Sequence, residues 1–270
     1  MTAVADSGMA PADGDAQKRA ARRRKAWWAN GLVVVLIGTW FAVSPFVPPY
    51  ILPGPLLVLQ KFLLFVTTKT YFFHLATTLF HVFGALAISL SIGAALALAA
   101  HYVRPVRLLI RGRIYPLLNS FSGIGWAVLA VIWFGQTDGA VFFAMACVLV
   151  PFIFINLHEG LESLDAELQE MGQSFTRSAL GRFRLITLPL LVPFGFAALR
   201  ISFGVAWKST LLAELFGANR GLGYVVNQSR QNYETEVILA VILWIIVIVF
   251  AGDRLFFKPV QERIQRHYGR

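Results

Sequence analysis

The chain has 270 residues, of which 57% are hydrophobic and 14% charged, and its mean hydropathy is +0.65. Soluble domains have about 45–50% apolar and about 25% charged residues, so this composition indicates a membrane protein. The net charge of +10 does not indicate nucleic-acid binding, because the basic residues fall in short clusters between apolar runs. A single cysteine, Cys147, excludes an intrachain disulfide and a cysteine-based metal cluster.

The first 26 residues are small and polar and then strongly basic. We expect residues 1–26 to form a disordered, basic cytoplasmic tail. The apolar run that follows is longer than the core of a signal peptide and has no A-x-A cleavage site, which favours a retained first span.

Six apolar segments are long enough to cross about 30 Å of hydrocarbon as helices. The sequence therefore predicts an all-α membrane protein with six transmembrane helices in a domain of residues 27–257, followed by a cytoplasmic tail at 258–270. The expected spans are about 27–47, 75–100, 115–136, 140–161, 187–214 and 237–257.

The distribution of basic residues predicts the orientation of these spans. With a cytoplasmic N-terminus, the cytoplasmic segments contain eighteen of the 24 Lys and Arg residues, and the outer segments contain four. Cytoplasmic loops carry such an excess of Lys and Arg, so we expect both termini in the cytoplasm.

A polar stretch interrupts the apolar sequence between the fourth and fifth expected spans. On a helix, Leu168, Met171, Phe175 and Ala179 form one apolar stripe. Gly181 then breaks the run before the next span. This loop, about 162–186, either rests on lipid headgroups or presents a helix to a soluble partner.

Several motifs resemble those of the permeases of binding-protein-dependent ABC importers, in particular the nitrate, sulfonate and taurine group. The polar stretch resembles the family's E-A-A…G…L-P loop, although Met171, Gly172 and Thr176 depart from it. The likeness covers roughly residues 50–260, and its other motifs are Leu52-Pro53-Gly54-Pro55, Trp133-Phe134-Gly135, Ala206-Trp207, Ala213-Glu214 and Gly221-Leu222-Gly223-Tyr224.

The resemblance implies a type I ABC importer permease fold in the bacterial inner membrane. It also implies a homodimer, two separate ATPase subunits and an external or lipid-anchored substrate-binding protein. In this family the loop is a coupling helix, so the expected ATPase-coupling residues are Glu167, Glu170, Met171, Gly172, Phe175, Thr176, Arg177 and Gly181.

The chain is not itself expected to be an enzyme or to hold a cofactor. It contains no G-x-x-x-x-G-K-[ST] phosphate-binding loop and no Gly-Lys pair, so ATP and Mg would bind to the partner ATPase. The expected substrate is a small anion of the sulfonate, taurine or nitrate type. A heterocyclic vitamin precursor is the alternative substrate, and an ion-coupled secondary transporter or a membrane-embedded enzyme is the alternative class of protein.

Ionisable and polar groups inside the spans are candidates for the substrate pathway. Lys208 is central in the fifth span and would favour an anion, or else pair with a carboxylate or carbonyl for structural reasons. Glu214 and Arg200 are too far apart along this helix to pair with each other, so each needs a partner elsewhere: another span, a second copy of the chain, water or substrate. His74 and His81 share a face, but two histidines without a nearby carboxylate make a poor metal site. The expected pathway residues are Lys208, Trp207, Glu214, Asn119, Ser120 and Ser122.

Overall fold

A computed structural model describes residues 31–163, 178, 181 and 183–268, and all regular secondary structure in these residues is helical. The chain divides into two compact units, Met1–Leu57 and Val58–Arg270. Most of the expected coupling loop and the tail at 1–26 lie outside the described residues.

In the first unit, the described part of the first apolar helix runs over Gly31–Phe46 and ends in a 3₁₀ turn, η1 (Ser44–Phe46). The indole Nε1 of Trp40 donates a hydrogen bond to the carbonyl of Pro53, 3.0 Å away. This bond fixes the proline-rich segment that follows the helix. Pro55 then begins α2 (Pro55–Thr67), whose residues from Val58 onward belong to the second unit.

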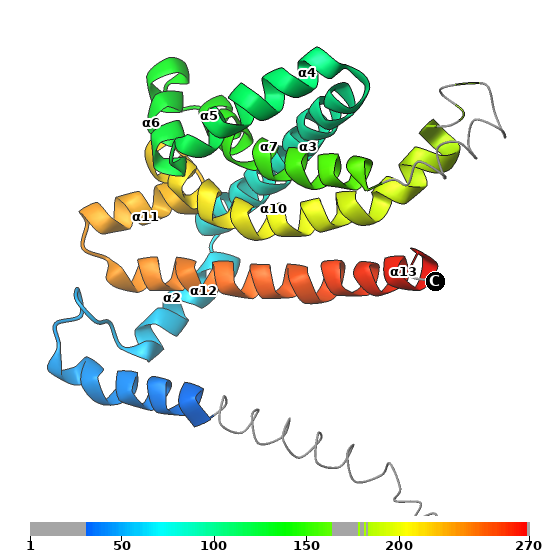
Figure 1. Ribbon diagram of the computed structural model, residues 1–270. Helices are drawn as coiled ribbons and strands as arrows, with labels where there is room; N and C mark the ends of the chain where they lie inside the picture. Colours follow the sequence, from blue (N-terminus) through cyan, green and yellow to red (C-terminus); the bar gives the residue numbers. More distant parts are fainter. Residues whose placement is uncertain (1–30, 164–177, 179–180, 182, 269–270) are drawn as a thin grey trace, which may run out of the picture. The chain divides into compact units, whose positions relative to one another are not determined.

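The second unit contains four helices that are long and apolar enough to cross a membrane. In Figure 1 they are α3 (Lys69–Tyr102), α7 (Asp138–Glu162), α10 (Leu188–Gly217) and the last helix of the chain. This last helix consists of α12 (Thr235–Gly252), the π-helical η4 (Asp253–Phe257) and α13 (Lys258–Tyr268). These elements confirm the second, fourth, fifth and sixth expected spans.

The third expected span is not one straight helix. After α4 (Arg104–Leu109), the π-helical η2 (Ile110–Ile114) and α5 (Tyr115–Ser120), the chain turns by 89° into α6 (Gly123–Phe134). The turn is at Phe121, which is extended, and Ser122, whose hydroxyl accepts a hydrogen bond from the N–H of Gly125. Serine at an N-cap satisfies a free amide of the first turn and so starts a new helix here.

If this bent pair counts as one span, the described residues contain five candidate spans. The sixth is the first apolar helix, whose expected start at residue 27 lies outside the described residues.

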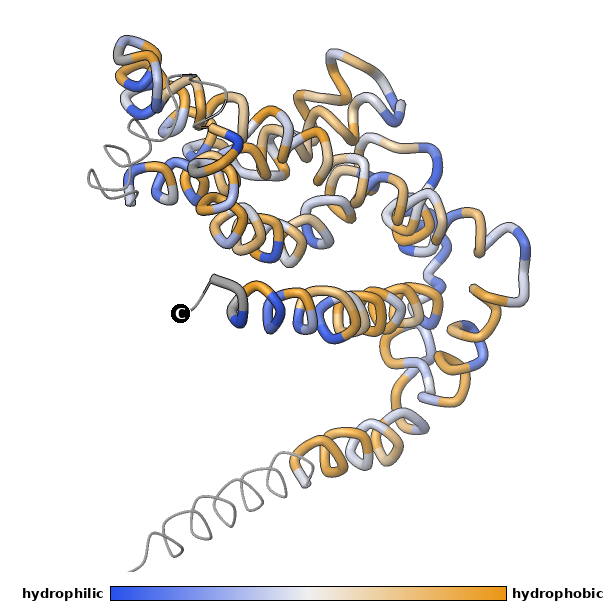
Figure 2. The backbone as a smooth tube through the Cα atoms, turned by 90° about the vertical axis from the view of Figure 1, so that its right-hand side faces the viewer, coloured by the Kyte–Doolittle hydropathy of each residue, from blue (hydrophilic) through white to orange (hydrophobic). Residues whose placement is uncertain are grey.

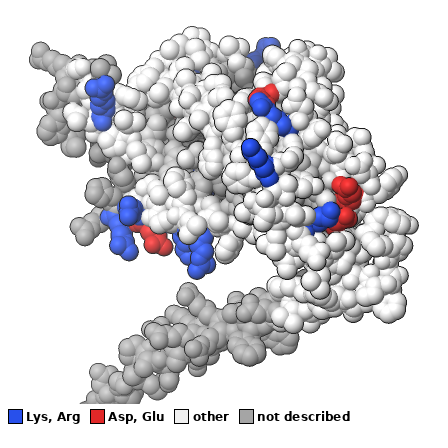
Figure 3. Space-filling model, turned by 180° about the vertical axis from the view of Figure 1, so that it is seen from behind, with Lys and Arg blue, Asp and Glu red and all other residues white. Residues whose placement is uncertain are grey.

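The core of the second unit lies where α7 packs against α3, α6 and α10. Small side chains line these contacts and let the helix backbones approach closely, as is typical of membrane helices. At Gly93 of α3, for example, an added Cβ would come within 2.7 Å of Ile153 on α7. The helices are apolar along most of their length in Figure 2, and most of the face visible in Figure 3 is free of charge, as a lipid-facing surface requires.

The second unit has two ends that differ in chemistry. At the Glu214 end, α10 finishes, α3 and α7 begin, and α11 (Leu222–Gln231) lies against α10. At the Glu162 end, α7 finishes, α10 begins after the π-helical η3 (Phe183–Thr187), and η2 approaches the last turn of α7. The charge distribution predicts that the Glu214 end is outside and the Glu162 end is cytoplasmic.

Candidate functional site

A fully buried carboxylate, Glu214, organises one end of the helix bundle. It lies in the last turn of α10, and its side chain is 0% exposed. Its oxygens accept hydrogen bonds from the hydroxyl of Thr78 (2.9 Å) and the backbone N–H of Gly223 (2.8 Å), and Nδ1 of His81 lies 2.7 Å away. A buried carboxylate is tolerated only when such partners replace water. Glu214 therefore ties α10 to α3 and to the start of α11.

The turn between α10 and α11 folds tightly around this carboxylate. Gly221 has φ 108° and ψ 172°, a conformation that is accessible essentially only to glycine. A Cβ there would lie 2.4 Å from the carboxyl carbon of Glu214, and one on Gly223 would lie 2.5 Å from the carbonyl oxygen of Leu211. The N–H of Leu222 donates to the hydroxyl of Thr78 (2.7 Å). The two parts of the Ala213-Glu214…Gly221-Leu222-Gly223 motif are thus in direct contact, because the two glycines pack against Glu214 and its neighbours in α10.

From Glu214 a chain of charged groups leads to the surface. Nε2 of His81 lies 3.3 Å from Oδ1 of Asp138, the first residue of α7, so the buried imidazole stands between two carboxylates. Asp138 in turn forms a two-point ion pair with Arg220, whose Nε is 3.0 Å from Oδ1. The hydrogen bonds that the guanidinium donates to Asp138 raise the pKa of Arg220 above its usual value, so the guanidinium stays charged.

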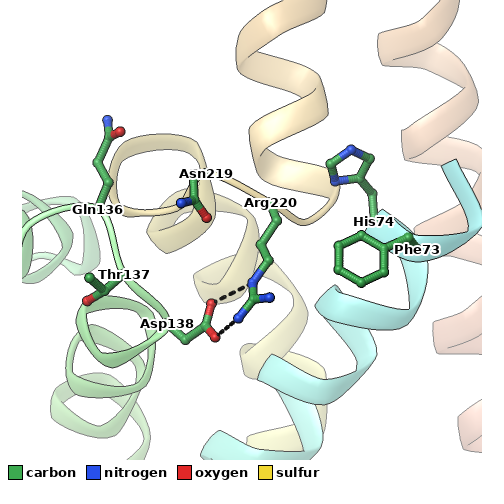
Figure 4. Close-up of a pocket in the computed structure, with 7 residues that line it drawn as sticks. All are labelled: Phe73, His74, Gln136, Thr137, Asp138, Asn219 and Arg220. Carbon is green, nitrogen blue, oxygen red and sulfur yellow. Dashed lines mark hydrogen bonds and ion pairs between the residues drawn. The ribbon is translucent and has the colours of Figure 1, made fainter. Parts of the chain in front are cut away.

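A cavity of about 590 Å³ lies over the Asp138–Arg220 pair (Figure 4). Its walls come from the start of α3, the α6–α7 turn and the α10–α11 turn. His74 accepts the N–H of Gly221 at Nδ1 (3.1 Å), which leaves the ring proton on Nε2 as a donor. The lining residues are Phe73, His74, Gln136, Thr137, Asp138, Asn219 and Arg220.

Lys208 has a different environment on the same helix. Its side chain is exposed on a face of α10 that also carries Ala197, Ile201 and Gly204. No hydrogen bond or ion pair joins it to any residue that the structure describes. Trp207, one residue away, is 1% exposed and lies in the core beside Phe203, without a hydrogen-bond partner for its Nε1 in the described residues. Lys208 and Trp207 therefore do not share a surface.

The other polar pathway candidates lie at the bend between α5 and α6. Asn119 and Ser120 are exposed and donate to backbone carbonyls one turn earlier, at 3.1 and 2.6 Å. Ser122 is also exposed and caps α6. These side chains form hydrogen bonds with backbone groups close in sequence, and they are exposed on the surface of the single chain.

Most expected coupling residues cannot be located, because Glu167, Glu170, Met171, Gly172, Phe175, Thr176 and Arg177 lie outside the described residues. Gly181 is described, and its N–H donates to the hydroxyl of Ser178 (3.3 Å) just before η3. The ion pairs nearest this loop are half-exposed. Arg111 pairs with Glu162 through two hydrogen bonds of 3.1 and 2.9 Å, and Arg200 pairs with Asp253 at 2.8 Å.

Sequence reasoning singled out Glu214, His81 and the Gly221-Leu222-Gly223-Tyr224 motif, but it did not predict that they are in contact. Thr78, Asp138 and Arg220 were not singled out. The pattern Thr137-Asp138, an N-cap followed by an acidic first residue, could have marked the start of α7 as a polar site. Of the partners left open for Glu214 and Arg200, the structure shows residues on other elements of the same chain, and the carboxylates close to His81 were not anticipated.

Comparison with known proteins agrees with this architecture. The chain belongs to the family of binding-protein-dependent transport system inner membrane components, which matches residues 87–258. It is therefore a multi-pass inner-membrane protein with the type I permease fold, a subunit of an ABC importer. Importers of this family work with ATPase and substrate-binding partners, and the permease subunit is a transporter component.

Individual relatives are similar over nearly the whole chain. The taurine transport system permease protein of Escherichia coli (strain K12) is 26% identical over 260 residues, 91% of each chain. A putative aliphatic sulfonates transport permease protein of Bacillus subtilis (strain 168) is 22% identical over 252 residues, 92% of this chain and 91% of the relative. The formylaminopyrimidine transport permease protein of Halalkalibacterium halodurans is 26% identical over 209 residues, 76% of this chain and 81% of the relative.

Proposed function

We propose that this chain is the permease subunit of an ATP-driven importer of a small oxyanion of the sulfonate, taurine or nitrate type, and that two copies of the chain enclose the pathway. The observation that carries this proposal is Lys208, an exposed cation on an otherwise apolar face of a membrane-spanning helix. A lysine at a helix centre costs about 2.5–3.5 kcal/mol in lipid. If a second copy of the chain packs opposite this face, the face would line a water-filled pathway. Lys208 would then be hydrated and could attract an anionic substrate.

The depth of the polar groups supports a common pathway. Lys208 is nine residues before Gly217, about 14 Å of helix rise from the Glu214 end. Ser122 is twelve residues before Phe134, about 18 Å of rise from the same end. Because α6 packs against α10, the ammonium of Lys208 lies at a similar depth to the polar side chains at the start of α6. Asn119, Ser120 and Ser122 would replace part of the hydration of the anion.

The energy for transport would come from separate subunits. We propose that the loop at about 162–186 docks on an ATPase, which binds ATP and Mg. Closure of two ATPase subunits would then move the loop. Since α10 begins directly after this loop, the displacement would reach the helix that carries Lys208 and favour one access state over the other. A substrate-binding protein would deliver the anion at the Glu214 end.

The proposal is tested with the complete complex in proteoliposomes. The chain, its ATPase subunits and its binding protein would be reconstituted, and uptake of radiolabelled taurine, methanesulfonate and nitrate would be measured. We expect uptake of at least one of these anions with ATP, and none with an ATPase variant that cannot hydrolyse ATP. Uptake driven equally well by an ion gradient without ATP would support a secondary transporter and overturn the proposal.

Replacement of Lys208 tests the pathway itself. Lys208→Ala removes one favourable interaction with the anion, and a loss of about 1.4 kcal/mol lowers uptake about tenfold. Lys208→Arg keeps the charge and should restore part of the activity. Lys69→Ala is the matched control, because Lys69 is also exposed but lies at the first residue of α3. Equal uptake by all three variants would contradict a role of Lys208 in the pathway.

The similarity to the formylaminopyrimidine permease supports a second candidate, a heterocyclic vitamin precursor. The same proteoliposomes separate the two candidates. ATP-dependent uptake of a labelled formylaminopyrimidine, with no uptake of any of the three anions, would establish the second and exclude the first.

A further inference from the structure

The cavity at the Glu214 end presents mainly hydrogen-bond donors to a ligand. Arg220, His74, Gln136 and Asn219 are among its lining residues, and each of these side chains carries at least one N–H donor. Its carboxylate, Asp138, is held on one side by Arg220 and contacted on the other by His81. A ligand with acceptor oxygens therefore meets unused donors, and the charge of Asp138 is already balanced.

Arg220 has donors to spare. A guanidinium has five N–H groups in a planar fork, and Asp138 engages Nε and one terminal nitrogen. The side chain is 43% exposed, so the other terminal nitrogen can be reached from the cavity. Figure 4 shows Arg220 and Asn219 next to each other on the α10–α11 turn, both above Asp138. Asn219 is exposed and makes no hydrogen bond with a described residue.

We infer that this cavity is a capture site for a small free oxyanion, which binds the free terminal nitrogen of Arg220 and the amide of Asn219 and competes with Asp138 for the positive charge of the guanidinium. This inference rests on the proposed function, because the captured anion is the one to be transported. Oxyanions that present two oxygens to the guanidinium match its planar fork, and charge-assisted hydrogen bonds of this kind are about twice as strong as neutral ones.

Competition for Arg220 gives the capture site a structural consequence. The Asp138–Arg220 pair joins the first residue of α7 to the α10–α11 turn. An anion that takes over part of the guanidinium weakens this connection, while the hydrogen bonds of Glu214 still hold α10 to α3. The bound anion thus favours the state in which α7 and the turn are separated, since a ligand shifts an equilibrium only through its different affinities for the two states.

The inference is tested by binding, independently of transport. The complete permease–ATPase complex would be placed in lipid nanodiscs without its binding protein, and equilibrium binding of radiolabelled methanesulfonate would be measured. Asn219→Asp places a negative charge in the cavity without removing a described contact, and we expect affinity to fall about tenfold. Arg230→Gln is the matched control, since Arg230 is an exposed arginine of α11 that does not line the cavity. It should bind as the unaltered protein does.

A second variant tests the competition. Asp138→Asn frees the guanidinium, so affinity should rise by about fivefold. Gel filtration and the melting temperature of each variant would show that the complex is intact. Unchanged or weaker binding by Asp138→Asn in an intact complex would overturn the competition, and equal binding by Asn219→Asp and Arg230→Gln would overturn the site.

The outcomes separate this inference from the proposed function and from another source of the oxyanion. Anion uptake that persists while Asn219→Asp binds normally would leave the importer proposal standing and remove the capture site. Absence of uptake for every anion would remove the importer proposal. If Asn219→Asp left methanesulfonate binding unchanged and weakened only the attachment of the binding protein to the proteoliposomes, the cavity would receive a carboxylate of that protein and the inference would be wrong.

Discussion

The two ends of the second unit use ion pairs in opposite ways. At the Glu214 end, Glu214 and His81 are both 0% exposed, and four elements meet around them. At the Glu162 end, the side chains of Arg111 and Glu162 are 44% and 37% exposed. Breaking a buried pair leaves an uncompensated charge, whereas an exposed pair is screened by water and contributes little. Ion pairs therefore stabilise the Glu214 end strongly and contribute little to the stability of the Glu162 end.

The backbone shows the same contrast. All three described π-helical segments, η2, η3 and η4, lie toward the Glu162 end of the unit. Such segments are rare and frequently occur at functional sites. The end that we expect to face the ATPase thus has the less regular helix geometry.

Removal of the buried carboxylate should have the largest effect on this contrast. In Glu214→Ala, Thr78, His81 and the N–H of Gly223 lose their shared acceptor, which we expect to cost about 3–5 kcal/mol of stability. The measurement is thermal unfolding of the purified protein in nanodiscs. Glu214→Gln keeps an acceptor oxygen and should lose less than Glu214→Ala. A melting temperature of Glu214→Ala equal to that of the unaltered protein would show that the buried network does not hold this end together.

A methyl group on the turn should have the next largest effect. Gly221→Ala forces a Cβ against the carboxylate of Glu214 at a φ of 108°, so we expect a loss of about 1–3 kcal/mol. Gly112→Ala is the matched control, because no atom lies within 4 Å of the added Cβ. Comparison of the two melting temperatures checks the prediction. A larger loss for Gly112→Ala would mean that the Glu162 end, not the Glu214 end, is the constrained one.

The exposed pair should have the smallest effect. Glu162→Gln removes the carboxylate charge that faces Arg111, and we expect a change of only about 0–1 kcal/mol. The difference should shrink further at high salt, because solvent ions screen exposed charges. Unfolding in low and high salt measures both. A salt-independent loss as large as that of Glu214→Ala would remove the distinction between the two ends.

Sequence patterns were sufficient to place the long helices, although α3 begins six residues before its expected start and the last helix continues beyond residue 257. Pro189 marked the first turn of α10, and the spacing of His74 and His81 placed them on one face of α3, where both contact residues near Glu214. These features are local, since helix periodicity and proline geometry depend on near neighbours.

Two features of the site were missed, the first because it depends on distant contacts and the second because it depends on backbone geometry that hydropathy does not report. Thr78 and His81 are more than 130 residues from Glu214 in sequence, so nothing near the motif identifies them as its partners. The bend at Ser122 lies in a run that is apolar on both sides, and hydropathy alone does not distinguish a broken span from a straight one. Ser122-Gly123 carried a cap signal, but its role as a helix start is clear only once Phe121 is seen to be extended.

The position of the Glu214 partners has a consequence for biogenesis. α3 is synthesised more than a hundred residues before α10, so Thr78 and His81 are already in the bilayer when Glu214 leaves the ribosome. The carboxylate then enters lipid beside a helix that can receive it, and the final hairpin of α11 and α12 can close only afterwards. We therefore expect that a substitution of His81 would impair the insertion of α10, which carries Glu214, and not the earlier insertion of α3, which carries the substitution.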